Sequence, residues 1–414
     1  MVVAVSESIP PDLATGARIQ LLRERRGMSR PVLAGLVGRG SSWLKKIERG
    51  ERELKSYELL SRLATALSIN DLSLLTGGTS PVPVSTAGRV MVPFVAEIRD
   101  AVRGQLWAPD TTDDLPSIDV LRGRVGEAWR LWHTSRFQRT EVGALLPGLL
   151  ADAHRLTRSL EGSERRQASV VLADAYRLAQ QATAYGCEPE LYWTIADRGR
   201  QASQDADEPV SLAGAAWSYA NGLRETGYAD EALRAVNEAV DMLRPRLENG
   251  SNDLRGMYGA LNLHAAITHA REGRDGDAWR YWDEANTVAG QLPKDYAHSW
   301  TVFSQGNTDF HAVSVGVDLR TPGAALQRAE SIDLKKVPSV ERRARVLVEF
   351  ARAYDHREDK SGALHFMNRA CESSPETVRY TPSARSLVAE LATTTRGPLK
   401  ADAMALAESV GVPM

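Results

Sequence analysis

Apolar positions near the start of the chain recur at helical spacing in five short runs, each bounded by residues that begin or end helices. The first run stops at Gly27, a residue suited to a helix C-terminus. Ser29 can begin the second run, and Ser41 or Ser42 the third, because a serine hydroxyl accepts from the unpaired N–H groups of a first turn. The pattern predicts a five-helix, all-α domain over residues 13–76.

Residues 94–414 continue as alanine-rich helical runs separated by short turns, without strand-like alternation. A small–bulky–small spacing recurs three times, at Ala232, Val236 and Ala239, at Ala278, Trp282 and Ala285, and at Ala363, Met367 and Ala370. The spacing resembles the tetratricopeptide repeat, whose paired helices cross at small residues. Copies one and two lie 46 residues apart, so the repeats are longer than usual. We predict an all-α fold with a C-terminal tetratricopeptide-like helical-hairpin solenoid, the alternative being a generic alanine-rich bundle.

Residues 77–93 separate the two helical regions. Six residues in this stretch oppose a continuous helix: Gly77, Gly78, Pro81, Pro83, Gly88 and Pro93. The stretch is therefore interpreted as an inter-domain linker, extended where a residue precedes proline.

Charge is balanced over the whole chain, with 51 basic and 53 acidic side chains, but it is unevenly distributed. Residues 1–76 carry 12 basic and 8 acidic side chains, whereas the remainder carries 39 and 45. A basic first domain joined to an acidic second region indicates an anionic partner for the first domain alone.

No membrane or redox chemistry is expected. The longest apolar stretch, Gly143–Ala151, is far shorter than the roughly 20 residues of a membrane span. Met1–Val5 lacks the basic start and long core of a secretory signal, so we expect a cytoplasmic protein without a membrane partner. Cys187 and Cys371 are the only cysteines and form no Cys-x-x-Cys motif, which opposes a disulfide framework or a zinc site.

Motifs for catalysis and cofactors are weak or incomplete. Gly38-Arg39-Gly40 lacks the third glycine and the Lys-Ser/Thr pair of phosphate loops. His264 and His269 are five residues apart, not the four that place two ligands on one helical face. No Gly-x-Ser-x-Gly motif is present. We therefore expect no enzyme, no cofactor and no metal site.

The first domain carries an ordered set of motifs. They are Arg23-Glu24-Arg25-Arg26-Gly27-Met28-Ser29, Leu33-Ala34, Gly38, Trp43-Leu44-Lys45-Lys46-Ile47-Glu48-Arg49-Gly50, Leu63-Ala64 and Leu74-Leu75. Together they resemble the helix-turn-helix of the lambda-repressor/XRE family of DNA-binding transcriptional regulators. The resemblance covers about 60 residues and implies a recognition helix in the major groove of double-stranded DNA.

The resemblance also implies roles for individual residues. Base edges would be met by Ser41, Ser42 and Lys46, with Lys45 beside them, and phosphates by Ser29, Arg30, Arg39, Arg52 and Lys55. An interior ion pair would join Arg23 to Glu48. Independently of the resemblance, Leu44 and Ile47 must face inward, which leaves serines and lysines on the outer side of the same helix.

The combination of the two regions resembles XRE–tetratricopeptide regulators of actinobacteria, and in architecture the peptide-pheromone receptors of Gram-positive bacteria. Late segments that carry this resemblance are Phe303-Ser304-Gln305-Gly306-Asn307, Val340-Glu341-Arg342-Arg343-Ala344 and Ala351-Arg352-Ala353-Tyr354. Repeat register predicts these groove-facing positions for a peptide or small-molecule effector: Trp217, Asn221, Arg224, Arg271, Asn307, Phe310, Arg345 and Arg352. For Trp217 a place in the core, and for the arginines a solvated or structural role, stay open as alternatives.

These features predict a sequence-specific transcription regulator whose repeat domain senses an effector. A homodimer reading an inverted-repeat operator is expected, because one such head meets too few bases for selective binding. The first alternative is a DNA-binding regulator controlled by a protein partner that docks in the repeat groove. The second is a scaffold that no longer binds DNA, which the intact Lys45, Lys46 and Arg30 oppose.

Overall fold

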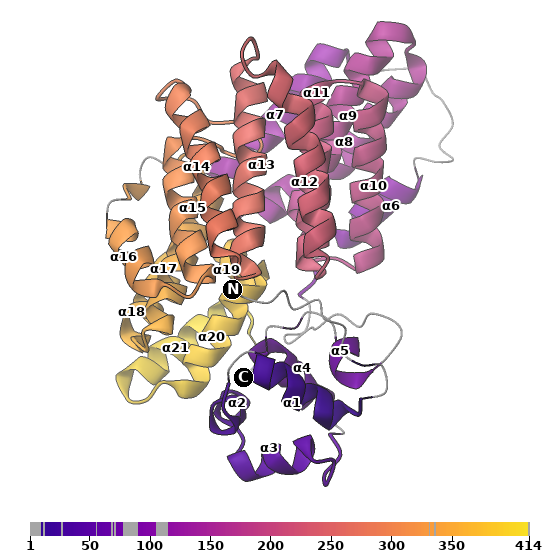
Figure 1. Cartoon of the computed structure of the whole chain (residues 1–414). Helices are drawn as coiled ribbons and strands as arrows, with labels where there is room; N and C mark the ends of the chain where they lie inside the picture. Colours follow the sequence, from indigo (N-terminus) through magenta and orange to yellow (C-terminus); the bar gives the residue numbers. More distant parts are fainter. Residues whose placement is uncertain are drawn as a thin grey trace. The chain divides into compact units, whose positions relative to one another are not determined.

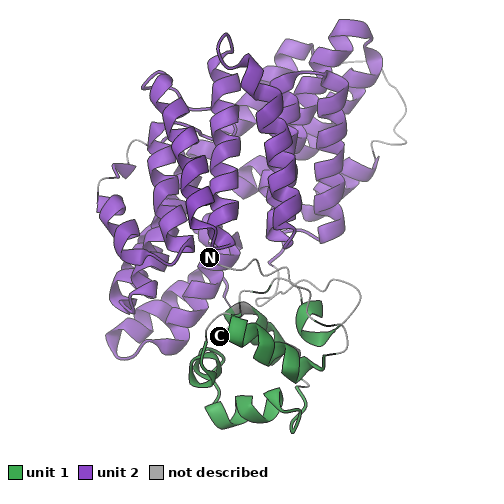
Figure 2. Ribbon diagram, in the orientation of Figure 1, with its two compact units in different colours: residues 1–88 green, residues 89–414 purple. Residues whose placement is uncertain are grey.

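The computed structural model describes residues 10, 13–25, 28–54, 56–67, 69, 72–77, 90–104, 115–330, 332–334 and 337–412. The chain divides into two compact units, unit 1 (residues 1–88) and unit 2 (residues 89–414), coloured separately in Figure 2. Every regular element in the described ranges is a helix, as Figure 1 shows, so the predicted all-α class is confirmed.

Unit 1 contains five short helices, as the apolar pattern predicts. They are α1 (Thr15–Arg25), α2 (Arg30–Leu36), α3 (Ser41–Glu48), α4 (Tyr57–Ala66) and α5 (Ser73–Thr76). Ile19, Leu33, Leu44 and Leu63 come from four different helices and are completely buried against one another. Each helix is too short to be stable alone, so this shared core holds the unit together.

The start of α3 differs from the sequence prediction. Gly40, in extended backbone conformation, occupies the position before the helix, so the expectation that Ser41 or Ser42 caps it was wrong. Both serines instead lie in the first turn and are exposed. Ser29 does occupy the N-cap position of α2, although its hydroxyl makes no capping hydrogen bond.

Unit 2 is an array of helices. In chain order they are α6 (Val95–Gly104), α7 (Ile118–Thr134), α8 (Gln138–Ser159), α9 (Gly162–Thr183), α10 (Pro189–Ala206), α11 (Pro209–Glu225), α12 (Ala229–Leu243), the 3₁₀ helix η1 (Arg244–Arg246), α13 (Asn252–Arg271), α14 (Asp275–Gln291), α15 (Gln305–Asp318), α16 (Pro322–Glu330), α17 (Val340–His356), α18 (Lys360–Ser373), α19 (Pro375–Tyr380), α20 (Pro382–Thr394) and α21 (Pro398–Ser409). Consecutive helices pack as hairpins, most extensively α9 with α10, α13 with α14 and α17 with α18. Each odd-numbered helix from α7 to α17 also packs against the next odd-numbered one, and we call this continuous layer the odd-helix layer.

Small residues lie in the interior of this array. Ala232, Ala278 and Ala363 are all completely buried. Gly259 of α13 makes the same point at closer range, because a Cβ there would lie 2.0 Å from Phe303 Cζ. Phe303 lies near the end of the α14–α15 connection, which therefore packs directly against the α13 backbone.

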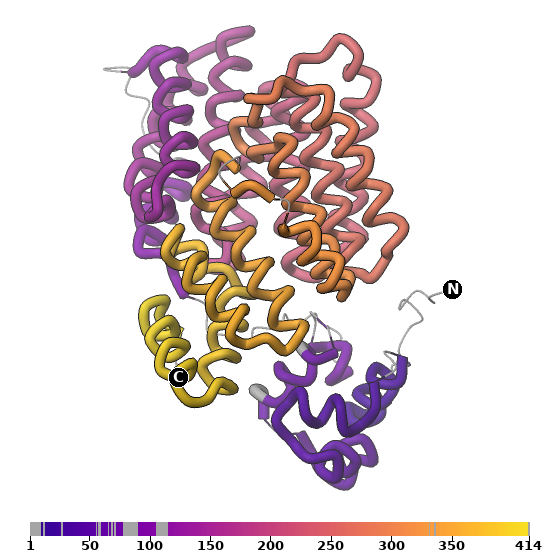
Figure 3. Tube along the Cα trace, turned by 90° about the vertical axis from the view of Figure 1, so that its left-hand side faces the viewer, coloured from indigo at the N-terminus to yellow at the C-terminus, as the bar shows by residue number. Residues whose placement is uncertain are grey.

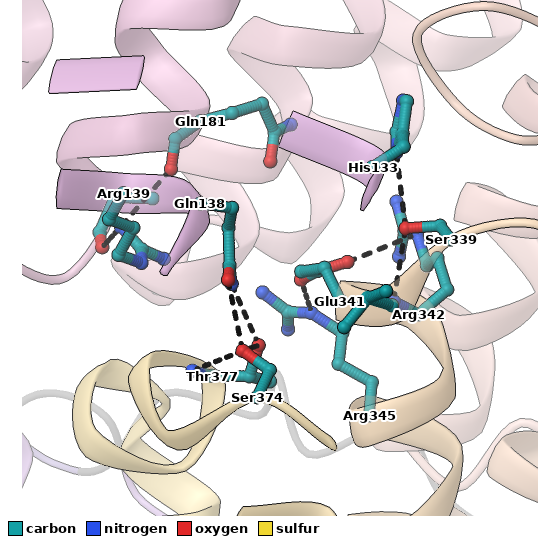
Figure 4. Close-up of polar contacts among 12 residues, drawn as sticks. His133, Gln138, Arg139, Gln181, Ser339, Glu341, Arg342, Arg345, Ser374 and Thr377 are labelled. Atoms are coloured by element: carbon teal, nitrogen blue, oxygen red, sulfur yellow. Dashed lines mark hydrogen bonds and ion pairs between the residues drawn. The ribbon is translucent and has the colours of Figure 1, made fainter. Parts of the chain in front are cut away.

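The array curves until its beginning and end meet. The Arg139 N–H donates to Glu376 Oε2 over 2.6 Å, and Gln138 Nε2 donates to Thr377 Oγ1 over 3.0 Å. His133 Nδ1 lies 3.1 Å from Ser339 Oγ, which joins α7 to the start of α17. Figure 3 shows the first and last helices of unit 2 on the same side, and Figure 4 shows the contacts of Gln138 and His133 in detail. The array is thus closed by contacts between residues more than 200 positions apart.

The predicted linker, residues 77–93, lies mostly outside the described residues. Its last part packs on unit 2, where Val92 is only 1% exposed and its N–H donates to the Gly186 carbonyl over 2.8 Å. The division into units falls between Gly88 and Arg89, within the predicted linker.

Candidate nucleic-acid interface and effector site

The outer face of α3 is polar and open. Leu44 and Ile47 are at most 2% exposed and hold the inner face of the helix in the core of unit 1. Ser41, Ser42, Lys45 and Lys46 project from the opposite side and are exposed, as the sequence predicts for the face that meets base edges. Ser29, Arg39 and Arg52 are also exposed, whereas Lys55 lies outside the described residues.

A buried carboxylate joins the three helices of this region. Glu48, whose side chain is completely buried, accepts from Arg23 Nε at 2.6 Å and from Arg23 Nη2 at 3.2 Å. The hydrogen bond to Glu48 is the main cause that raises the pKa of Arg23. Arg23 also donates to the Met28 carbonyl over 2.8 Å. The ion pair between Arg23 and Glu48 is therefore present and ties α1 to α3.

The Glu48 carboxylate also pairs with Arg30, and the sequence did not predict this ion pair. Arg30 Nε lies 2.5 Å from Glu48 Oε2, and 37% of the Arg30 side chain is exposed. A single carboxylate thus fixes the start of α2 to the end of α3. Arg30 remains available to a phosphate only through its terminal nitrogens, so its role as a phosphate contact depends on Glu48.

Two of the eight residues expected to contact an effector belong to the core instead. Trp217 is 7% exposed and packs with the α11–α13 core, and Phe310 is 4% exposed and packs with α17 and its neighbours. The expectation that these rings line a groove was wrong, because apolar side chains of neighbouring helices enclose both rings in the core.

The four predicted arginines do lie on the odd-helix layer, where carboxylates engage them. Arg271 Nη1 is 2.8 Å from Glu225 Oε1, and Arg271 Nε is 3.6 Å from Asp318 Oδ2. Arg352 Nη2 is 2.8 Å from the other oxygen of Asp318. Arg345 pairs through Nε with Glu341. These pairs form a charged network across α11, α13, α15 and α17.

Charge pairing in this network overcomes burial. Desolvation alone would raise the pKa of Glu225, but the guanidinium groups of Arg271 and Arg224 lower it to about 2. The pKa of Glu341 is likewise lowered to about 2 against desolvation, chiefly by Arg345. Both carboxylates are therefore ionised at neutral pH and hold their arginines in place.

The two predicted asparagines differ in their surroundings. Asn221 Oδ1 accepts from Arg224 Nη2 over 2.9 Å, so it orients that arginine. Asn307 is 2% exposed, and its Oδ1 has no hydrogen-bond partner among the described residues.

Comparison with known proteins identifies unit 1. Residues 14–73 match the family described as a helix-turn-helix domain. The first unit contains an XRE-like helix-turn-helix domain. No curated protein matches the chain. Among solved structures, the crystal structure of ComR from S. thermophilus in complex with DNA and its signalling peptide ComS is 15% identical and covers 87% of this chain and 99% of that chain, with a TM-score of 0.25. That TM-score is too low to establish a shared arrangement.

Within the helix-turn-helix domain, α2 and α3 are the paired helices, and residues 37–40 are the turn between them. Gly38 permits this turn, since its φ of 69° lies in the left-handed region. Arg39 follows, with its guanidinium carbon 6.0 Å from the centre of the Trp43 ring. The aromatic ring supports this cation at the edge of the polar face of α3.

Other kinds of site are not evident in the described ranges. No group of three His, Cys, Asp or Glu side chains there could hold a metal ion. Nor is any helix in that part of the chain long and apolar enough to cross a membrane. A depression of about 430 Å³ lies between α7 and α8, away from the charged network, lined by Val120, Gly123, Arg124, Glu127, Leu145 and Leu149.

Proposed function

We propose that the chain is a sequence-specific, DNA-binding transcription regulator whose helical-repeat unit binds an effector. The observation that carries the DNA-binding part is the exposed serine and lysine face of α3 within a helix-turn-helix domain. Two hydroxyls and two flexible cations offer donors and acceptors to base edges without steric block. Selection of bound duplexes from a random library tests it, and recovery of no enriched motif would contradict it.

Lys46→Ala is expected to relax operator choice and to weaken specific binding by about 1–3 kcal/mol, because the variant loses a contact to a base edge. Arg52→Ala is the matched comparison. Arg52 is proposed to contact a phosphate, and the loss of a phosphate contact weakens binding to all DNA sequences equally. In that variant the plot of log K for DNA binding against log salt concentration should become less steep by about one unit of slope. Fluorescence anisotropy on operator and random duplexes, over a salt series, measures both effects. Equal losses on both duplexes in the two variants would contradict this division of roles.

The regulator is proposed to act as a homodimer on an inverted repeat. A single helix-turn-helix head offers three or four side chains to bases, whereas two heads related by a twofold axis read two half-sites about 10 base pairs apart. Light scattering of the whole chain, free and on the selected duplex, should give two copies per duplex. One copy on the selected duplex would rule the dimer out.

The effector is proposed to bind the tetratricopeptide-like unit 2 on the odd-helix layer. The charged network of Arg224, Glu225, Arg271, Asp318 and Arg352 supports a polar peptide or small molecule there. The alternative, a protein partner docking in the repeat groove, fits less well, because α7 and α8 contact α17 and α19 and close the array. An effector that changes the affinity for operator DNA must itself bind with an affinity that operator DNA changes by the same factor.

A further inference from the structure

Exposed apolar side chains are concentrated on the α7–α8 hairpin. Six large hydrophobic side chains are exposed in the described part of unit 2, and three of them belong to this hairpin. They are Val120 on α7, which is 55% exposed, Phe137 immediately before α8, which is 50% exposed, and Leu145 on α8, which is 44% exposed. Exposed apolar groups that gather on one element, rather than lying singly, indicate a surface that another molecule covers.

Val120 and Leu145 line the depression of about 430 Å³ between the two helices, and the buried Leu149 lines it as well. The two charged residues among its lining side chains, Arg124 and Glu127, have opposite signs. A depression with apolar walls and balanced charge does not suit a nucleic acid or a strongly charged peptide, because such partners are attracted by a field of one sign. It suits the apolar side chains of another protein surface.

Three glycines of the same hairpin have no packing role within the described part of the chain. Gly123 and Gly126 on α7 and Gly148 on α8 are exposed, and a Cβ at any of them would meet no atom within 4 Å. By contrast, Gly143 of α8 is explained inside the chain, because a Cβ there would lie 2.1 Å from the Phe94 ring. A glycine inside a helix destabilises it by about 1 kcal/mol relative to alanine. The three exposed glycines do, however, allow a second backbone to approach both helices closely.

Ion pairs on the surface of the hairpin balance its charge. Three of them join an arginine of α7 to a carboxylate of α7 or α8: Arg122 with Asp119, Arg124 with Asp152, and Arg130 with Glu127. The Arg124 pair spans the two helices over 2.7 Å. Paired groups of equal number do not repel an identical face. In a twofold contact each arginine can also meet a carboxylate of the other copy, so the hairpin is electrostatically complementary to itself.

The hairpin is large enough for a reversible contact between two copies. α7 has 17 residues and α8 has 22, so the packed helices run side by side over about 25 Å and together are about 20 Å wide. A contact over this face would bury about 500 Å² on each copy, or about 1,000 Å² in total. That area lies at the lower end for specific protein interfaces, as expected of a dimer that forms and dissociates.

We propose that the outer face of the α7–α8 hairpin binds the same face of a second copy of this chain about a twofold axis. Val120 and Leu145 supply the apolar contact, Gly123 and Gly148 allow the two hairpins to approach closely, and the balanced ion pairs surround the contact without repulsion. The inference rests on the proposed homodimer and names the surface through which it forms.

Sedimentation equilibrium of the whole chain measures the dimer Kd without reference to DNA. The wild type should show a reversible monomer–dimer equilibrium at micromolar concentration. Val120→Asp and Leu145→Asp should each raise the Kd by about tenfold or more, since each places a charge in an apolar contact. Both side chains are exposed in the single chain, so neither change disturbs its core. Met404→Asp is the matched control, because Met404 is 43% exposed on α21, and this variant should leave the Kd unchanged.

Gly123→Gln separates the contact between copies from the stability of the helix. Glutamine is the better helix former, so the Tm should rise, whereas its side chain blocks the close approach and should raise the dimer Kd by about tenfold or more. A higher Tm with an unchanged Kd would overturn the proposal, as would a dimer whose Kd is the same in the wild type and all three hairpin variants. A wild type that stays monomeric, free and on the selected duplex, would overturn the proposed homodimer as well. None of these results bears on the selection of a DNA motif, which tests the DNA binding of unit 1 separately.

Discussion

Replacing Glu48 by glutamine is expected to destabilise unit 1 by about 3–5 kcal/mol, the cost of breaking a buried ion pair from one side. The carboxylate is completely buried, and it accepts from Arg23 and Arg30. Glutamine keeps the shape but removes the charge, so Arg23, with 6% of its side chain exposed, is left as a buried cation. The free energy of unfolding of unit 1 should fall accordingly, and DNA affinity with it, because α2 and α3 lose their common anchor.

Hydrogen exchange of the whole chain measures this effect in unit 1 alone, through peptides from α1 and α3. Glu51→Gln is the matched control, because Glu51 is half-exposed and its pair with Arg49 spans 3.6 Å. That variant should change stability by at most about 1 kcal/mol. The double variant Arg23→Met with Glu48→Met should recover part of the loss, because neither charge then stays buried alone. Unchanged protection of α1 and α3 in Glu48→Gln would show that the pair does not hold the unit.

The exposed polar face of α3 could be predicted from sequence because its information is local. Leu44 and Ile47 are three residues apart and must face the same core, so the serines and lysines between and beside them must face outward. The one departure is Arg30, which the sequence indicates as a free phosphate contact. Its bond to Glu48 joins two helices 18 residues apart, and no local periodicity encodes that approach.

The sequence predicted the arginines of the charged network of unit 2 but not their carboxylate partners. The repeat register placed Arg271 on the odd-helix layer, but it did not predict the partner Glu225. The signal was present, because Glu225 and Arg271 are 46 residues apart, the same interval as the first two small positions of the predicted repeat, Ala232 and Ala278. Residues at equal positions of neighbouring repeats stack, so opposite charges at that interval indicate a pair.

Closure of the array had no such signal. Arg139 and Glu376 are 237 residues apart, and each taken alone has the composition of an ordinary helix surface. The contact exists only because the small curvature of each hairpin accumulates over the whole of unit 2. For Trp217 the sequence allowed two positions, because its helical register fits both the core and a groove. Only the packing of neighbouring helices shows that it lies in the core.

Unit 2 is expected to lose stability steeply as the pH falls from about 6.5 towards 4. Burial is the main cause that lowers the pKa of five histidines, to about 4 for His133, His154, His298 and His356 and to about 3 for His311. These rings stay neutral in the folded chain, while the unfolded chain binds their protons below about pH 6.5. Their contribution is therefore fully present above about pH 6.5 and is lost as the pH falls to the folded values.

The slope is set by the number of protons taken up on unfolding. Each such histidine contributes about 1.4 kcal/mol per pH unit within the window. Asp174 offsets the contribution of one histidine. Burial raises its pKa to about 6, so the folded chain binds this proton more tightly than the unfolded chain and gains stability as the pH falls. Partial exposure of some rings lowers the sum further, and we expect a net loss on the order of 3 kcal/mol per pH unit.

Urea unfolding followed by circular dichroism between pH 7.5 and 5 measures this slope. His298→Gln should lower it by about one proton. The ring of His298 is 2% exposed, and its Nδ1 accepts from the N–H groups of Trp300 and Thr301, which a protonated ring could not do. The carboxylate of Asp253 partly offsets this effect by favouring the charged ring. His365→Gln is the control, because that side chain is exposed on α18 and should leave the slope as it is. A urea midpoint that stays constant from pH 7.5 to 5 would contradict the prediction. It would mean that the folded chain binds these protons as readily as the unfolded chain, which the burial of the rings should prevent.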